Sequence, residues 1–390
     1  MLSEAAPPKS STSDPDTRTH IAQQFVSDAT IRTIRPLGSG NINDTYLVEL
    51  AGTDPPFVLQ RINTEVFPQP HQVMDNLCQF ASHAHQRLTQ TPFNRRWEVP
   101  TVLRTQTGHH HWVDARGNLW RGLSFVPDTT TFNTIQDPDH ATEIGYGLGC
   151  FHSLLSDLPT ARLVDTLPGF HVTPHYLSQY DAVVAQTLSQ GRSLSLEEHR
   201  CCQLIATYRG RLSILEDAKN EGRLPLRSIH GDPKINNILI DTATGQAVSL
   251  IDLDTVKPGL VHYDIGDCLR SSCNPLGEET HQWQAVTFDL ELCVAVLQGY
   301  LSGASHFLDA IEYDYIYDAI WLITVELGLR FFSDHLAGDI YFKTQRPQHN
   351  LQRALVQFQL AESISAQKQA IQSVIAQLKA DYCSDAGCAA

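Results

Sequence analysis

The chain has 390 residues, 42% of them hydrophobic, and a formal net charge of −15. This length exceeds one ordinary domain and suits two, and the apolar content is enough for a sizeable core. The negative charge counts against nucleic-acid backbones and anionic membranes as partners, whereas a neutral or cationic small molecule remains compatible with it. By itself the acidity indicates no more than a well-solvated surface.

Neither a signal peptide nor a membrane span is expected from the sequence. The N-terminal residues lack the apolar core of a signal peptide, and no run of about 18 apolar residues occurs. The nine cysteines include no C-x-x-C pair, which disfavours a zinc site or a disulfide framework. We therefore expect a cytoplasmic protein with reduced thiols and no membrane span.

The first third of the chain has mainly β-like patterns. Residues 1–24 are rich in Ser, Thr, Pro and Asp and are predicted to form a mobile tail. From Ile31 onward, strands are predicted on both sides of a glycine-containing segment, followed by a third strand over F-V-L-Q-R-I. Residues 70–90 have helical spacing. Residues 25–127 are therefore predicted to form a β-rich N-terminal lobe.

After Pro127 the patterns become mostly helical, which predicts a larger helical lobe over residues 128–380 and a tail over 381–390. One β hairpin interrupts the helices: I-N-N-I-L-I-D, the turn T-A-T-G-Q, then A-V-S-L-I-D-L-D. The predicted fold class is therefore α+β with two lobes. Helical spacing is found in residues 141–155, 196–219, 284–301, 311–336 and 350–379.

The glycine-containing segment G-S-G-N-I-N lies between the first two predicted strands. Backbone amides of such a segment can bind the phosphate oxygens of a nucleotide. Because it joins strand to strand and lacks the third glycine of G-x-G-x-x-G, a Rossmann or Walker site is disfavoured, and an ordinary hairpin turn is the alternative. We expect Gly38, Ser39, Gly40 and Asn43 to bind the nucleotide, while Asn41 and Asn43 could face either phosphate or substrate.

The stretch S-I-H-G-D-P-K-I-N-N-I-L-I carries the most specific pattern, with His230, Asp232, Lys234 and Asn237 in H-x-D-x-K-x-x-N. The spacing from Asp to Asn equals that of the protein-kinase catalytic loop. In such a loop the Asp accepts a proton from the attacking hydroxyl and the Asn reaches Mg²⁺. Lys234 can offset charge on the transferred phosphoryl group. A polar turn before a strand is the alternative for each residue taken singly.

The hairpin ends in I-D-L-D, where protein kinases have the metal-binding aspartate of D-F-G. We expect Asp252 and Asn237 to bind Mg²⁺, because this ion prefers one or two hard protein oxygens plus phosphate oxygens and water. Asp254 is expected on the substrate side. Asp264 in Y-D-I-G-D is predicted to accept backbone N–H groups of the catalytic loop, and His230 is also expected to be structural.

The lysine that protein kinases carry on their third strand is absent, and Gln60 and Arg61 stand there. Alternation along a strand lets only one of them face the nucleotide. Gln60 takes the lysine position if F-V-L-Q aligns with F-V-L-K, whereas Arg61 supplies the charge if the register shifts by one residue. The missing lysine also supports an alternative, an ATP-binding pseudokinase that acts as an interaction module.

Together these motifs resemble the aminoglycoside phosphotransferase/choline kinase superfamily, whose signatures are H-G-D-x-x-x-x-N and I-D-x-D/E. Further segments, including I-D-L-D-T-V-K-P-G and R-F-F-S-D-H-L-A-G-D-I-Y-F-K, are similar to N-acetylhexosamine 1-kinases, and the likeness runs from about residue 30 to about residue 365. The resemblance implies a bilobal protein-kinase-like fold and the use of ATP and Mg²⁺. It also implies that Phe125 and Val126 form the hinge that holds adenine and that Arg330 and Tyr341 contact the sugar.

The implied reaction is transfer of the γ-phosphoryl group of ATP to a sugar hydroxyl, the anomeric C1 hydroxyl of GlcNAc or GalNAc. The residues expected on the substrate side are Asn41, Asp254, Arg330 and Tyr341. Another alcohol as acceptor, an aminoglycoside, choline or a different sugar, is the alternative within the same fold. The expected partners are ATP and a small sugar, without nucleic acid or membrane, for a monomer or homodimer.

Overall fold

The computed structural model describes residues 15–38 and 42–385, and the chain forms two compact units. One unit comprises the chain up to Ala81 and Pro100–Pro127, and the other comprises Ser82–Val99 and the chain from Asp128 onward. The segment 82–99, expected in the N-terminal lobe, packs with the second unit. Its Arg95 forms an ion pair with Glu143, and its Glu98 N–H donates to the Val248 carbonyl (2.7 Å).

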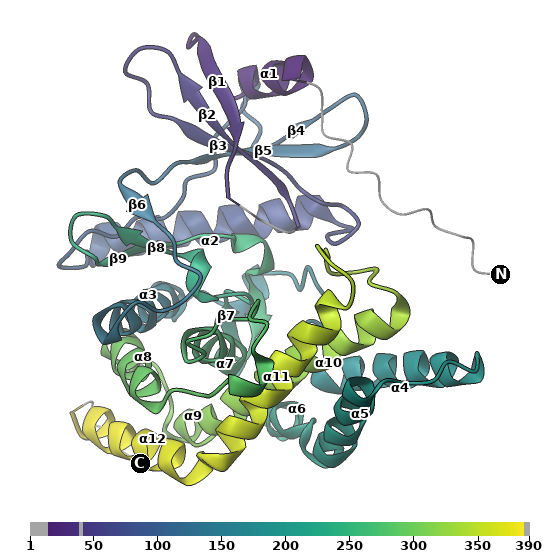
Figure 1. Ribbon diagram of the computed structural model, residues 1–390. Helices are drawn as coiled ribbons and strands as arrows, with labels where there is room; N and C mark the ends of the chain where they lie inside the picture. Colours follow the sequence, from purple (N-terminus) through teal and green to yellow (C-terminus); the bar gives the residue numbers. More distant parts are fainter. Residues whose placement is uncertain (1–14, 39–41, 386–390) are drawn as a thin grey trace. The chain divides into compact units, whose positions relative to one another are not determined.

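The first unit contains a five-stranded antiparallel sheet in the order β1-β2-β3-β5-β4 (Figure 1). Alternate side chains of a strand share one face, and Tyr46, Leu59 and Trp120 form a buried core on one face of this sheet. The strands predicted around the glycine-containing segment are confirmed. The strands are β1 (Ile31–Pro36), β2 (Asp44–Leu50), β3 (Phe57–Arg61), β4 (Trp112–Val113) and β5 (Leu119–Ser124).

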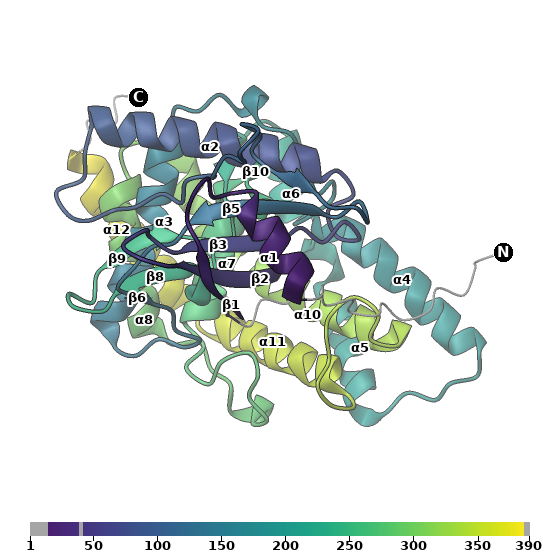
Figure 2. The ribbon, with the colours of Figure 1, turned by 90° about the horizontal axis from the view of Figure 1, so that it is seen from above.

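Helix α1 (Pro15–Gln23) covers this apolar face, and Figure 2 shows it lying across the sheet. Its Ile21 and Ala22, and Phe25 just after it, belong to the same core. The prediction of a mobile tail is therefore wrong for residues 15–23. The polar composition of residues 1–24 gave no sign of α1 in the sequence. Burial of a few apolar side chains against the sheet stabilises this helix. Residues 1–14 of the predicted tail lie outside the described residues.

Helix α2 (Pro70–Gln90) confirms the predicted helix over residues 70–90. Its buried side chains include Val73, Leu77, Phe80 and Ala84, which recur at helical spacing along one side of the helix. The helix contributes residues up to Ala81 to the first unit and its remaining residues to the second.

The second unit is mostly helical, as predicted. The predicted segment 196–219 forms two helices separated by a 3-10 turn, and 350–379 forms two helices that part at Gln367. The last helix reaches Asp385, so the predicted C-terminal tail is wrong for residues 381–385. The helices are α3 (Pro138–Leu155), α4 (Thr173–Ser189), α5 (Leu196–Tyr208), α6 (Ile214–Asn220), α7 (Val261–Ser272), α8 (Leu290–Ala304), α9 (Ala310–Asp314), α10 (Ile316–Ala337), α11 (His349–Ala366) and α12 (Lys368–Asp385).

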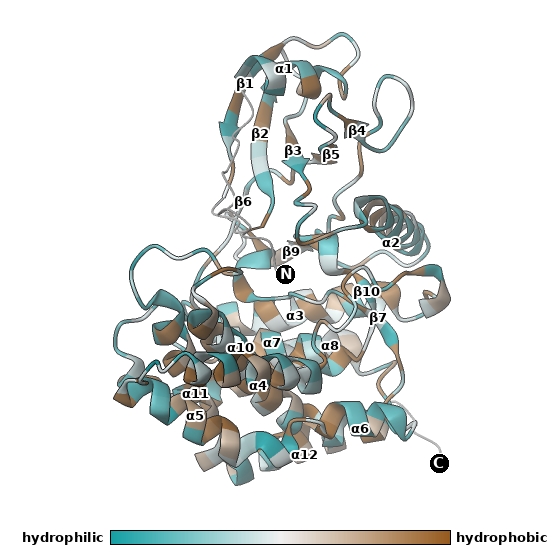
Figure 3. Cartoon of the chain, turned by 90° about the vertical axis from the view of Figure 1, so that its right-hand side faces the viewer, coloured by the Kyte–Doolittle hydropathy of each residue, from teal (hydrophilic) through white to brown (hydrophobic). Residues whose placement is uncertain are grey.

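Two features shape the helical core. Helices α3 and α8 approach backbone to backbone, because an added Cβ at Gly145 would lie 1.9 Å from the Val296 carbonyl oxygen and one at Gly299 equally close to that of Thr142. Helix α10 is buried along most of its length and packs against α11, α7 and α4. Figure 3 shows apolar residues along α3, α8 and α10. A helix that is apolar on all sides belongs inside a protein.

Two small sheets lie on either side of the predicted catalytic loop, which contains Asp232 and Asn237. Strands β6 (Thr129–Thr130), β8 (Ile238–Asp241) and β9 (Ala247–Leu250) form one, and β7 (Arg227–Ile229) pairs with β10 (Lys257–Gly259) in the other. The hairpin β8–β9 confirms the predicted β hairpin. The Ile251 N–H donates to the Asn237 carbonyl (2.9 Å), which extends the pairing. Asn237 and Asp252 therefore lie at the same end of the hairpin.

The predicted α+β class, with a β-sheet unit first and a larger helical unit after it, is confirmed. Within the described residues, none of the helices combines the length and the apolar character needed to span a membrane. The eight cysteines among those residues are free thiols.

Candidate active site

The segment after β7 turns sharply at Gly231, which has a φ of +87°. An added Cβ at this position would lie 2.8 Å from the Thr255 carbonyl oxygen. Such a φ is strained for any residue with a side chain, and the close approach leaves no room for one. Glycine is therefore required here, and its geometry directs the chain from His230 toward Asp232.

The side chain of Asp264 on α7 fixes this turn by hydrogen bonds to its backbone. Its fully buried carboxylate accepts the backbone N–H of His230 (2.6 Å) and of Gly231 (2.8 Å), and lies 2.8 Å from His152 Nε2. The sequence predicted this type of contact for Asp264. The carbonyl of His230 accepts the Thr255 hydroxyl (2.7 Å), so both residues of the turn are held by side chains from elsewhere in the unit.

His230 is a structural residue in a neutral form. Its Nε2 lies 2.9 Å from the Ile251 carbonyl and must donate, while Nδ1 accepts the Asp232 N–H (3.2 Å). Burial lowers the pKa of this imidazole below its ordinary value. The neutral ring links the loop to the residue just before Asp252, which keeps the two predicted functional segments in register.

The loop brings Asp232, Lys234 and Asn237 together. Asp232 Oδ2 accepts Lys234 Nζ (2.7 Å) and Asn237 Nδ2 (3.3 Å), and that same amide nitrogen donates to the Asp232 carbonyl (2.7 Å). Asp232 Oδ1 accepts no hydrogen bond from any described residue, and the side chain is 30% exposed. One carboxylate oxygen is therefore held and the other is available to a ligand.

Electrostatics also link these residues to Asp252. Burial alone would lower the pKa of the Lys234 ammonium, but the carboxylates of Asp232 and Asp252 raise it above its ordinary value. Asp252 itself is exposed and has a left-handed backbone, with a φ of +65°. Backbone strain in a residue other than glycine is common at functional sites.

The available atoms fit a magnesium ion. The side-chain nitrogen of Asn237 donates hydrogen bonds to Asp232 within the loop, while Asn237 Oδ1 has no hydrogen-bond partner among the described residues. Among those residues no group of three or more His, Cys, Asp or Glu side chains is arranged to hold a metal. One amide oxygen and the Asp252 carboxylate are hard ligands, as Mg²⁺ prefers when phosphates complete its shell.

Asp254 and Asp267 are buried more deeply. Asp254 is only 3% exposed, which counts against its predicted contact with the substrate. Asp267 forms an ion pair with Arg270 through Oδ1 (2.8 Å). The Asp267 pKa is lowered, because the charges of Arg270 and His171 outweigh the effect of burial. Of Asp252, Asp254, Asp264 and Asp267, Asp252 is thus the one that is exposed to a ligand.

Arg330 and Tyr341, predicted to contact the sugar, lie close together. The Arg330 guanidinium carbon lies 5.9 Å from the centre of the Tyr341 ring, and Tyr341 is 52% exposed. No described residue forms a hydrogen bond or ion pair with the Arg330 guanidinium. Its charge also interacts with Asp232. The other rings around it, at 4.9–5.4 Å, are those of Phe170, Tyr176 and Phe342.

Sequence reasoning missed His152, His171 and Glu326, which support the loop from α3, the segment before α4, and α10. They lie at least 60 residues from the loop in sequence, so no local motif contains them. The one available signal was Glu326 itself, a charged residue within the apolar helical stretch I-W-L-I-T-V-E-L-G-L. A charge in such a stretch is costly unless it is paired.

In the first unit the structure separates Gln60 from Arg61. Gln60 Oε1 accepts Arg121 Nε (3.0 Å) and Nη2 (2.7 Å) from the opposite position on β5, whereas Arg61 points to the other face and pairs with Asp44. The Gln60 face is the one toward α2, since the charge of Arg121 acts on the Cys78 thiol of that helix. The sequence did not point to Arg121.

The glycine-containing segment is described only at its ends. Gly38 has a φ of +72°, and Ser39, Gly40 and Asn41 lie outside the described residues. Asn43 Oδ1 accepts the Asn63 N–H (2.9 Å), so this side chain braces the end of the segment. Its predicted contact with a nucleotide stays a prediction.

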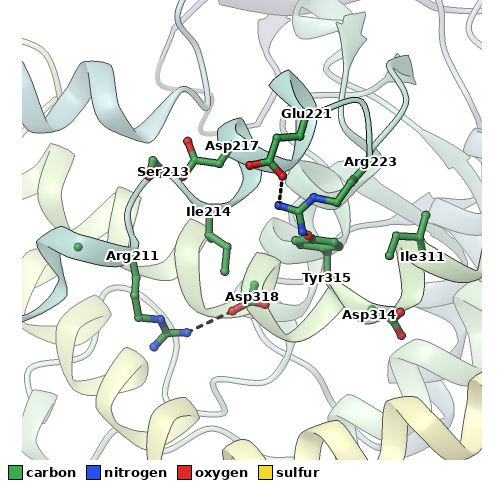
Figure 4. Close-up of a pocket in the computed structure, with 11 residues that line it drawn as sticks. Arg211, Ser213, Ile214, Asp217, Glu221, Arg223, Ile311, Asp314, Tyr315 and Asp318 are labelled. Atoms are coloured by element: carbon green, nitrogen blue, oxygen red, sulfur yellow. Dashed lines mark hydrogen bonds and ion pairs between the residues drawn. The ribbon is translucent and has the colours of Figure 1, made fainter.

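The predicted hinge residues follow β5. Val126 is buried, and Phe125 lines a hollow of about 500 Å³ on the first unit together with Leu50, Phe57 and Leu103. A second hollow, of about 560 Å³ on the helical unit, contains none of the predicted site residues (Figure 4). Its arginines are already paired, Arg211 with Asp318 and Arg223 with Glu221. We therefore do not assign the reaction to this second hollow.

Comparison with known proteins places the chain in a family. A family model described as a phosphotransferase enzyme family (APH) matches residues 33–300. The structure is similar to an aminoglycoside phosphotransferase from Alicyclobacillus acidocaldarius, with a TM-score of 0.59 and 16% identity over 91% of this chain and 96% of that one. It is also similar to a choline kinase from Cryptosporidium parvum (TM-score 0.59, 14% identity, 95% and 99%) and an ethanolamine kinase from Plasmodium vivax (0.52, 14%, 85% and 84%).

These solved structures share the fold, and the family match covers more than half of the chain, including the loop at Asp232 and the hairpin that ends at Asp252. The chain therefore belongs to the phosphotransferase enzyme family (APH).

Proposed function

We propose that this protein is an ATP-dependent sugar kinase that transfers the γ-phosphoryl group of ATP to the anomeric hydroxyl of an N-acetylhexosamine. The observation that carries the proposal is the hydrogen-bonded loop in which Asp232 keeps one carboxylate oxygen available beside Lys234 and Asn237. Phosphoryl transfer depends mainly on positioning and on charge stabilisation, and this loop supplies both.

Asp232 is the proposed general base. Its Oδ1 accepts the hydrogen bond of the sugar hydroxyl and takes up the proton as the oxygen attacks phosphorus, while Oδ2 stays bound to Lys234 and Asn237. Lys234 keeps its positive charge because the neighbouring carboxylates raise its pKa, so it can offset the negative charge on the phosphoryl group. Asn237 and Asp252 would hold Mg²⁺, which supplies charge neutralisation to the phosphates.

For the nucleotide we propose the glycine-containing segment from Gly38, and Gln60 in the position of the kinase lysine. The support for Gln60 is its place on the sheet face toward α2, whereas Arg61 is engaged with Asp44 on the other face. The positive charge at that position then comes from Arg121, which Gln60 holds by two hydrogen bonds. The backbone at Phe125 and Val126 is the proposed adenine contact.

For the acceptor we propose a neutral sugar held by Arg330 and Tyr341. The guanidinium of Arg330 is surrounded by aromatic rings and forms no ion pair or hydrogen bond with the described residues. It can donate hydrogen bonds to hydroxyl or acetamido oxygens of a sugar, and the exposed Tyr341 ring can pack against the sugar face. A cationic acceptor such as choline would face a like charge there, which disfavours it.

The test is an assay of phosphate transfer from ATP over amino sugars, hexoses, choline, ethanolamine and aminoglycosides. We expect the highest kcat/KM with GlcNAc or GalNAc. Arg330→Lys should raise the acceptor KM roughly tenfold or more while changing the ATP KM little, since a planar set of donors to the acceptor is lost. Arg209→Lys, a change at an exposed arginine paired with Asp181, is the control.

Efficient turnover of choline or an aminoglycoside with none of GlcNAc or GalNAc would overturn the proposed acceptor. ATP binding without transfer to any compound of the panel would instead favour the pseudokinase alternative.

A further inference from the structure

His171 occupies an unusual position next to the loop. Its Nδ1 lies 2.9 Å from Glu326 Oε1 on α10, and its Nε2 lies 2.8 Å from the carbonyl oxygen of Gly231, the residue before Asp232. The ring is buried, and Glu326 is only 1% exposed. Glu326 Oε2 accepts the Thr173 hydroxyl (2.7 Å), so both of its carboxylate oxygens are engaged.

These partners determine where the protons are. A carbonyl oxygen can only accept, so Nε2 must carry a proton. Between Nδ1 and Glu326 the shared proton belongs on the ring, because an imidazole is ordinarily a stronger base than a carboxylate. Both ring nitrogens are then protonated, and the ring is an imidazolium. His230 differs, since one of its nitrogens accepts a backbone N–H and the ring is neutral.

The surroundings favour this charge. Burial alone would lower the pKa of His171, but the charge and hydrogen bond of Glu326, together with the Gly231 carbonyl and Asp267, raise it above the ordinary value. The ring also stacks on Tyr263 with 5.3 Å between ring centres. The titratable and charged groups that face this site are Glu326 and Arg330 of α10, Tyr263 and Asp267 of α7, Tyr176 of α4, and Lys257 of β10, which binds the Phe170 carbonyl.

We propose that His171 is a positively charged positioning residue at neutral pH, an imidazolium that ties the Gly231 carbonyl beside the base Asp232 to Glu326 of α10. This inference rests on the proposed function, because it gives Asp232 the part of general base. Glu326 precedes Arg330 by one helical turn on α10. The hydrogen-bonded chain Gly231–His171–Glu326 therefore connects the loop that holds the base to the helix that carries the proposed acceptor contact.

The charge makes the connection depend on pH. Because the folded-state pKa of His171 is raised, its stabilising contribution is complete below about pH 6.5 and is lost as the pH rises through the folded-state value. Deprotonation would leave Nδ1 facing a carboxylate without a proton between them. We therefore expect kcat to decline over the pH range in which His171 loses its proton.

The protonation state can be measured without any activity. In the full-length protein labelled with ¹⁵N-histidine, His171 should show two protonated ring nitrogens at about pH 7.5, one unit above the ordinary imidazole pKa. The signal is assigned by its loss in whichever of His171→Gln and His171→Asn folds. A single protonated nitrogen at that pH overturns the inference, whatever the acceptor of the enzyme is.

Kinetics then separate charge from shape. Glu326→Gln keeps the shape and lets a neutral His171 accept from the new amide, so the ring should become singly protonated. In His171→Gln, misplacement of the loop can lower kcat by up to about 10²-fold. The kcat of Glu326→Gln should fall less than that. Its pH profile should also lack the decline in kcat that accompanies deprotonation of His171 in the wild type. His199→Gln, at an exposed histidine of α5, should match wild type. A wild-type kcat that stays constant while His171 loses its proton also overturns the inference.

Discussion

At the scale of single residues, hydrogen bonding distinguishes the two carboxylate oxygens of Asp232. Lys234 and Asn237 hold Oδ2, and Oδ1 has no partner among the described residues. The side chain is thereby oriented before any ligand binds, and it retains an acceptor for the hydroxyl group. A general base needs this combination of fixed geometry and an available lone pair.

Asp232→Asn should remove the proposed general base while it leaves the fold intact. The amide can still accept from Lys234 and Asn237, so the unfolding temperature and ATP binding should stay close to wild type. We expect kcat to fall by roughly 10²–10⁴-fold, the usual contribution of general-base catalysis. Steady-state kinetics with the best acceptor, alongside thermal unfolding, measure both quantities.

Glu197→Gln, a carboxylate-to-amide change on the exposed side of α5, is the control for Asp232→Asn and should behave as wild type. A turnover of Asp232→Asn within a few-fold of wild type would contradict the assignment of the base.

Asp264 and Asp254 show what a local motif can and cannot predict about single residues. The hydrogen bonds of Asp264 to the loop are of the predicted kind, because buried backbone N–H groups need an acceptor and a buried carboxylate needs donors. Asp254 was expected near the substrate and is buried instead. Two residues after Asp252 the chain has entered a 3-10 turn, in which strand alternation no longer tells which way a side chain points.

At the scale of elements, the loop owes its shape to three packed neighbours. Strand β7 precedes the loop and the hairpin β8–β9 follows it. Helix α7 supplies Asp264, which accepts the backbone N–H of Gly231. The carbonyl and N–H groups of the turn are taken by Thr255, His171 and Asp264, so few backbone groups are left to water. Rigidity of this kind is what accurate placement of a catalytic group requires.

Gly231→Ala tests that rigidity against a matched control. Gly245, in the turn of the hairpin, also has a positive φ (+71°), but an added Cβ there meets nothing within 4 Å. Gly245→Ala should cost about 1–2 kcal/mol of unfolding free energy from the left-handed backbone alone. Gly231→Ala should cost a further 1–3 kcal/mol or so for the clash with Thr255, and should also lower kcat.

Urea unfolding of both glycine variants measures the difference. Equal free energies of unfolding for the two would show that the close approach at Gly231 does not constrain the loop.

Elements were predictable in proportion to the regularity of their patterns. Helix α2 was located to the residue because its apolar residues recur at helical spacing, and the hairpin β8–β9 because a turn separates two apolar runs. Helix α1 was missed since its apolar residues cluster at its end, and only the sheet face beneath them makes their burial favourable. The break between α5 and α6 was missed for another reason: no proline marks it in the sequence.

At the scale of the whole molecule, the proposed nucleotide and metal should stabilise the fold. A ligand that binds only the folded state adds about 2.7 kcal/mol at a hundredfold excess over its Kd. We expect a higher unfolding temperature with ATP and Mg²⁺ than with ATP and a chelator. Asp252→Asn should abolish most of this difference between the two conditions, because a charged oxygen ligand is lost.

The measurement is thermal unfolding of the wild type and of Asp252→Asn in both conditions, with Glu197→Gln as the control. An undiminished effect of Mg²⁺ in Asp252→Asn would remove that residue from the proposed metal site without affecting the assignment of Asp232.

The sequence by itself determined the α+β class, the order of the main elements and the residues of the loop and hairpin, because each is encoded by short-range spacing of apolar, glycine and polar residues. Only the tertiary structure decided which side chains support that loop. His152, His171 and Glu326 come from distant segments, and their hydrogen bonds exist only once α3, α7 and α10 have packed. It likewise decided which of Gln60 and Arg61 lies on the sheet face toward α2, since the face of a strand has meaning only when a neighbouring strand and helix lie against it.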